Sequence, residues 1–122
     1  MPRFVILEHN YPAKHWDFLL EEGNCLRAWK LLESPQAFLL SPDGQEKVLL
    51  KAEGAANHRL IYLDYEGPIS GNRGEVKRFD FGTFSYIEQN DQTTKIDLQG
   101  VQLKGVFRLS QKQSSWLFET DQ

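Results

Sequence analysis

Hydrophobic and polar residues alternate along much of the chain, which predicts short β-strands. Residues two apart lie on the same face of a strand, and several apolar pairs have this spacing. No segment carries apolar residues at helical spacing over three turns, and one helical turn is predicted near Pro12 to His15. The apolar pairs are Ile96 and Leu98, Val101 and Leu103, and Phe107 and Leu109.

Turn residues separate these runs at intervals of about eight to twelve residues, a spacing typical of small β-barrels and sandwiches. The turns are Glu22-Gly23-Asn24, Ser41-Pro42-Asp43-Gly44 and Asp80-Phe81-Gly82. We therefore predict an all-β fold with minimal helix, a small closed or partly closed barrel of about eight to ten short antiparallel strands. The predicted strands are Arg3–Glu8, Phe18–Glu21, Cys25–Leu32, Gln36–Leu40, Lys47–Ala52, Glu75–Phe79, Thr83–Glu88, Lys95–Leu98, Val101–Leu109 and Ser115–Glu119.

Length and composition fit one globular domain over residues 1–122, with 40% hydrophobic and 25% charged residues. This excludes a disordered or fibrous chain. Cys25 is the chain's one cysteine, so no disulfide within the chain is possible and a reducing, cytoplasmic location is expected. The apolar run Phe4–Leu7 is too short for a signal peptide, and no window is long enough to span a membrane.

The net charge is −3, so the chain as a whole does not attract nucleic acid. An anionic ligand would have to be held by a local group of residues.

The segment from Glu8 to Asp17 carries the first such group. His15 and Asp17 are two residues apart and face the same way on an extended segment, and a five-residue loop can fold His9 beside them. Two imidazoles and one carboxylate form a facial triad that leaves coordination positions open for water and substrate. Such a site suits Mn, Fe or Zn acting as a Lewis acid. The same residues also occur as strand-end and turn residues that bind nothing.

A second group follows at residues 57–74. His58, Arg59 and Arg73 can donate to a phosphate. Gly67, Gly71 and Gly74 permit the positive φ and close backbone approach of an anion-binding loop. They also suit an ordinary bulged connection between strands.

These motifs, in this order, resemble the 3′-phosphoesterase domain of bacterial DNA ligase D, and more closely the short stand-alone proteins named after the ligase's N-terminal domain. The resemblance covers nearly the whole chain. It is carried by Arg3–His9, His15–Glu21, Leu26–Trp29, His58–Gly67, Gly74–Val76 and Asp80–Gly82, with looser similarity at Leu103–Phe107 and Trp116–Phe118.

The resemblance implies that His9, His15 and Asp17 hold a divalent metal, with Mn favoured and Zn or another divalent ion as alternatives. It implies that His58 and Tyr62 lie at the phosphate and act in catalysis. The implied activity is removal of a phosphate or ribonucleoside from the 3′ end of DNA or an RNA–DNA primer strand during DNA repair, with a ligase or polymerase as partner.

Two positions depart from the family pattern. Leu19 stands where the ligase domain carries a phosphate-binding arginine, and Glu33 stands near a family lysine. A charge-assisted hydrogen bond contributes about 1.5–3 kcal/mol, so losing the arginine predicts a roughly ten- to hundredfold slower reaction. Arg59, Arg73 or Lys14 are candidate replacements.

Two other functions compete with the enzyme. The departures and the negative charge are compatible with a catalytically weakened module that binds nucleic-acid ends or phosphate. An exposed patch of aromatic residues would instead indicate a protein-binding domain. The candidates for that patch are Trp16, Trp29, Trp116, Phe79 and Phe81, although most of them are expected in the core.

Overall fold

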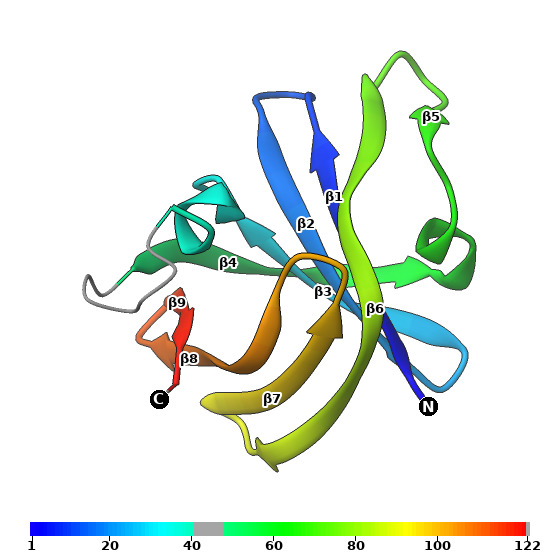
Figure 1. Cartoon of the computed structure of the whole chain (residues 1–122). Coiled ribbons are helices and arrows are strands. Elements are labelled where there is room, and N and C mark those ends of the chain that lie inside the picture. Colours follow the sequence, from blue (N-terminus) through cyan, green and yellow to red (C-terminus); the bar gives the residue numbers. More distant parts are fainter. Residues whose placement is uncertain (41–47, 122) are drawn as a thin grey trace.

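The computed structural model describes residues 1–40 and 48–121. Within these residues nine strands form one sheet, joined by two short 3₁₀ helices (Figure 1). No helix in this part of the chain is long and apolar enough to cross a membrane. The elements are β1 (Arg3–His9), β2 (His15–Glu22), β3 (Cys25–Leu31), η1 (Pro35–Phe38), β4 (Leu49–Arg59), η2 (Leu60–Leu63), β5 (Gly67–Pro68), β6 (Glu75–Gln89), β7 (Thr93–Gly100), β8 (Lys104–Lys112) and β9 (Ser115–Thr120).

The sheet closes on itself. Strands follow the order β1-β2-β3-β4-β9-β8-β7-β6-β5, and β1 also pairs with β6. All pairings are antiparallel, so β1–β4 and β6–β9 make a closed barrel and β5 is an extra strand on β6. Closure leaves these strands without the long open sheet edges that favour aggregation. The predicted all-β barrel is confirmed.

The barrel interior is filled by large side chains at alternating positions. Phe4 and Ile6 of β1, and Trp16, Phe18 and Leu20 of β2, point inward into one core. Trp29 and Trp116 pack edge to face in the same core. The three tryptophans are therefore buried, as expected for most of the aromatic residues that were candidates for a surface patch.

A second core lies on the opposite face of β1–β3. Val5 and Leu7 alternate with the inward residues of β1, and Leu19 does the same on β2. Leu63 of η2 covers them, together with half-buried Tyr62. The segment from η2 to β5 leaves the end of β4 and returns to β6, as Figure 1 shows in green. Because Leu63 packs against this second core, η2 lies on the outer face of the barrel.

Several predicted elements are wrong. Gln36–Leu40 is not a strand, because Ser34 caps a 3₁₀ turn by accepting from the Gln36 N–H, and Pro35 begins the turn. Pro12 to His15 contains bends, and His15 already begins β2. The Ser41–Gly44 turn and Lys47 lie outside the described residues.

The predicted break at Asp80-Phe81-Gly82 is also wrong, because β6 runs through it. The buried Asp80 carboxylate accepts from the backbone of Gln102 and Leu103, so it holds the neighbouring turn and β8 begins only at Lys104. A side chain at position 82 would overlap the Gln99 carbonyl. Asp80 thus anchors the turn before β8, and Gly82 allows β6 to lie close to β7.

Strand β4 extends seven residues beyond the predicted Ala52, to Arg59. Residues Gly54-Ala55-Ala56 show no alternation of large apolar and polar side chains, so the sequence does not predict a strand there. This stretch forms a strand because it pairs with β3. This extension carries His58 to the outer face beside η2.

Candidate functional site

Two histidines and an aspartate meet where β1 ends and β2 begins. His9 and His15 are directly opposite each other across the strand pair, and Asp17 lies two residues further along β2 on the same face. His15 and Asp17 are buried and His9 is half-buried. The five-residue connection thus folds back as the sequence predicted.

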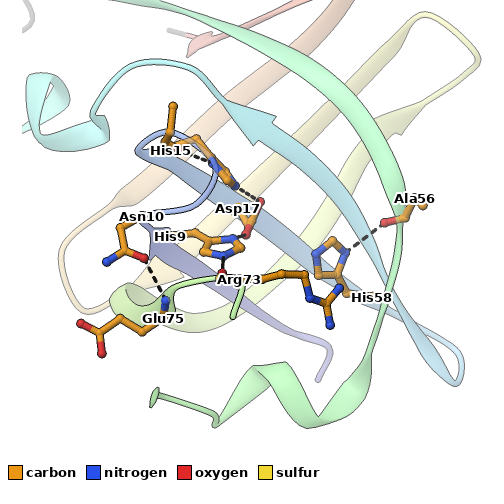
Figure 2. A network of polar contacts seen from close by, with 9 residues as sticks. His9, Asn10, His15, Asp17, Ala56, His58, Arg73 and Glu75 are labelled. Atoms are coloured by element: carbon orange, nitrogen blue, oxygen red, sulfur yellow. Dashed lines mark hydrogen bonds and ion pairs between the residues drawn. The ribbon is translucent and has the colours of Figure 1, made fainter. Parts of the chain in front are cut away.

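The carboxylate of Asp17 lies between the two imidazoles (Figure 2). Asp17 Oδ2 is 3.3 Å from His9 Nδ1, and Asp17 Oδ1 is 3.1 Å from His15 Nε2. One donor atom from each residue falls within 4.8 Å of the others. Such a group of atoms can surround one metal ion, which needs each ligand roughly 2 Å away.

Hydrogen bonds on the far side of each ring determine which nitrogen faces Asp17. His15 Nδ1 donates to the Ala13 carbonyl at 2.9 Å, and His9 Nε2 donates to the Arg73 carbonyl at 2.9 Å. A carbonyl oxygen only accepts, so in the neutral rings both remaining nitrogens direct lone pairs toward the carboxylate. Lone pairs opposed in this way repel unless a cation or proton lies among them. The donor set therefore fits a divalent cation, with backbone carbonyls orienting the ligands as in known metal sites.

The same contact affects the protonation of His15. The hydrogen bond to Asp17 raises the pKa of His15, while partial burial and the charge of Lys30 oppose the rise. Asp17 thus stabilises positive charge at this position, which a bound cation would also supply.

Backbone geometry at Gly74 brings the Arg73 carbonyl to His9. Asn10 Oδ1 accepts from the Glu75 N–H at 2.8 Å, which ties the residues after β1 to the start of β6. Gly74 has φ +75°, and a Cβ there would overlap Asn10 Oδ1 and lie 2.7 Å from Tyr11 Cβ. Only glycine allows the loop to approach this closely.

An open cavity of about 390 Å³ adjoins these ligands, and His9 and Asp17 form part of its wall. The rest of its polar lining comes from the end of β4 (Asn57, His58 and Arg59), from Tyr62 of η2 and from Arg73 in the loop before β6. Figure 2 shows the Arg73 side chain extending toward His58. His9, His15 and Asp17, the predicted metal ligands, form one ligand cluster. The predicted phosphate-binding residues His58, Tyr62, Arg59 and Arg73 lie on the cavity wall.

Contacts on the cavity wall fix its cationic and aromatic groups. His58 Nδ1 donates to the Ala56 carbonyl at 3.0 Å, which leaves Nε2 to exchange a proton with a ligand. The Tyr62 ring lies edge-on to His58, with ring centroids 5.9 Å apart. Arg73 Nε donates to the Ser70 carbonyl at 2.7 Å, so its guanidinium is held in place.

The positions that depart from the family pattern lie outside the cavity lining. Leu19 is 0% exposed in the second core, and Glu33 accepts from the Lys51 N–H at 2.9 Å. Lys14 pairs with Glu8 instead. Of the three candidate replacements for the arginine, Arg59 and Arg73 line the cavity and Lys14 does not.

Lys30 was missed by the sequence analysis. It is the direct cross-strand neighbour of Asp17, so its side chain lies on the ligand face. The register of this hairpin would have identified it. Glu22 pairs with Cys25 across the Gly23-Asn24 turn, so Asp17, five residues before Glu22, pairs with Lys30, five residues after Cys25. The contribution of Asn10 is a tertiary contact, and no sequence pattern marks it.

Comparison with known proteins gives one family. No curated protein matches the chain. The family model described as the DNA ligase D 3′-phosphoesterase domain matches residues 7–111, a range that includes the ligand cluster and the whole polar lining of the cavity. Since the match spans most of its length, the chain belongs to the DNA ligase D 3′-phosphoesterase domain family.

Proposed function

We propose that this protein is a metal-dependent phosphoesterase that removes a 3′-phosphate or 3′-ribonucleoside from nucleic-acid ends during DNA repair. Residues 1–122 would form one domain of this kind, working in the cytoplasm beside a ligase or polymerase. One observation carries the proposal: His9 and Asp17 of the ligand cluster share a cavity with His58, Tyr62 and Arg73. The candidate metal ligands and the candidate phosphate-binding residues thus face the same space.

His9, His15 and Asp17 would hold the metal, with Mn²⁺ favoured over Zn²⁺ and other divalent ions. When bound, a divalent ion supplies Lewis-acid polarisation of a phosphoryl oxygen. The two backbone carbonyls would keep both imidazoles in the tautomer that ligation needs.

His58, Tyr62 and the arginines would act on the phosphate itself. His58, protonated at Nε2, would donate to the phosphate or leaving oxygen, because its Nδ1 is already engaged by Ala56. The Tyr62 hydroxyl would orient the phosphate. Arg73 and Arg59 would neutralise its charge in place of an arginine at position 19.

Paired variants test the proposal. His9→Ala should abolish both bound Mn²⁺ and hydrolysis of a 3′-phosphorylated oligonucleotide. His58→Ala should keep the metal and lose about 10²–10⁴-fold in turnover, the usual contribution of a general acid or base. Metal per chain is measured by elemental analysis, and Mn²⁺-dependent thermal stabilisation gives a second readout. Wild-type metal content and turnover in His9→Ala would refute the proposal.

The buried Leu19 favours one alternative, a weakened module that binds ends without cleaving them. Binding of the wild-type protein to 3′-phosphorylated oligonucleotides, with no product after long incubation with Mn²⁺, would select it.

A further inference from the structure

A second cavity, of about 210 Å³, adjoins the 390 Å³ cavity proposed to hold the phosphate. Arg59, Tyr62 and Ile69 line both, so the two spaces share walls. Ile61, Tyr65 and Pro68 complete most of the second lining. A ligand anchored by its phosphate beside Tyr62 can therefore reach the second cavity with the group attached to that phosphate.

The second cavity presents apolar and aromatic surface. The rings of Tyr62 and Tyr65 are perpendicular, with centroids 5.9 Å apart. The Tyr65 hydroxyl donates to the Pro68 carbonyl, which fixes the ring. Ile61 is 59% exposed, although it is a large aliphatic residue. Such surface suits a flat, weakly polar group.

The chemistry of the substrate class supplies such a group. A 3′-terminal nucleotide joins a phosphate to a flat base through one sugar. Bases stack on aromatic side chains regardless of sequence, because every base has a π-face. The Arg59 guanidinium, 5.8 Å from the Tyr62 ring centroid, adds a planar cation at the boundary of the two cavities.

We propose that the second cavity is a subsite for the base of the 3′-terminal nucleotide, with Tyr65 as its fixed aromatic wall. This inference rests on the proposed function and deepens it. The protein would recognise a nucleoside phosphate end rather than any phosphomonoester, without preferring one base.

The test compares two oligonucleotides with a 3′-phosphate, one ending in a normal nucleotide and the other in an abasic tetrahydrofuran residue. Tyr65→Leu keeps apolar volume but removes the ring, and Tyr65→Phe keeps the ring. Affinity is measured by fluorescence anisotropy with Mn²⁺, and kcat/KM by product release.

Wild type and Tyr65→Phe should prefer the base-bearing end by about tenfold, mainly through KM, given the energy of stacking one base. In Tyr65→Leu, the ratio of kcat/KM for the base-bearing end to kcat/KM for the abasic end should be near one, and the abasic end should still be processed. Equal use of both ends by the wild type, or an unchanged ratio in folded Tyr65→Leu, would overturn the subsite. If the wild type cleaves neither end, the phosphoesterase proposal fails, and the ratio of binding affinities alone decides the subsite.

Discussion

Gly74 has no side chain, yet it determines how closely the loop that carries Arg73 approaches His9 and Asn10. Its positive φ lets the loop before β6 approach Asn10, and the adjoining Arg73 carbonyl then orients His9. The geometry of the candidate metal ligands therefore depends on the loop before β6, which also carries Arg73.

Gly74→Ala should lower both stability and metal affinity. Its Cβ would overlap Asn10 Oδ1, and a non-glycine residue at this φ adds strain, so we expect a loss of about 1–3 kcal/mol in the free energy of unfolding. Mn²⁺ affinity should fall about tenfold or more, as when a group orienting a metal ligand is removed. Urea unfolding and calorimetric titration measure the two effects.

Gly23→Ala is the matched control. Gly23 also has positive φ, but a Cβ there meets nothing within 4 Å. It should lose some stability from strain and keep wild-type Mn²⁺ affinity. Equal metal affinities in the two variants would contradict the role assigned to Gly74.

The convergence of His9, His15 and Asp17 could be predicted because these residues are chemically distinctive and closely spaced. His9, His15 and Asp17 fall within one hairpin, where alternation alone determines the face of each side chain. The carbonyl contacts could not be predicted, since Arg73 reaches His9 across 64 positions of sequence. Any residue type has a backbone carbonyl, so no pattern identifies the one that is used.

At the scale of elements, η2 both packs into the second core and lines the 390 Å³ cavity. Leu63 is 5% exposed in the second core, and the adjacent Tyr62 lines the cavity. The position of Tyr62 thus depends on the packing of its apolar neighbour.

Leu63→Ala should destabilise the protein by about 2–4 kcal/mol, as expected for a leucine removed from a core. Ile61→Ala, on the same short helix but 59% exposed, should change the free energy of unfolding by less than about 0.5 kcal/mol. Urea unfolding of the two variants gives the comparison. Similar losses would show that η2 is not anchored through Leu63.

The wrong predictions for β4 and β6 share a cause. Asp and Gly are residue types that favour turns, but Asp80 and Gly82 both lie inside β6. Asp80 is a buried hydrogen-bond acceptor for the turn before β8. Gly82 lies where β6 comes too close to the Gln99 carbonyl for any side chain. Gly54 and Ala55 lack strand propensity and are in β4 because β3 pairs with them. Local sequence predicted strands wherever side chains alternate, and it failed where tertiary contacts determine the element.

At the scale of the molecule, charge decides how nucleic acid can be held. The net charge of −3 opposes long-range attraction, so affinity for an end must come from cations at the cavity. Arg59 and Arg73 line it, whereas Lys14 is paired with Glu8. A few local contacts imply a weak dependence on salt.

We therefore expect the logarithm of the affinity for a 3′-phosphorylated single strand to fall with the logarithm of salt concentration with a slope between about −1 and −2, since each phosphate contact on a single strand contributes about −0.7. Arg73→Ala should reduce the magnitude of this slope by about 0.7. Lys14→Ala should leave it unchanged, because Lys14 lies outside the cavity lining. Anisotropy titrations across a NaCl series measure the slopes. A slope steeper than about −4 would mean that many phosphates are bound along an extended cationic track, and the strand would then be held along its length rather than at its end.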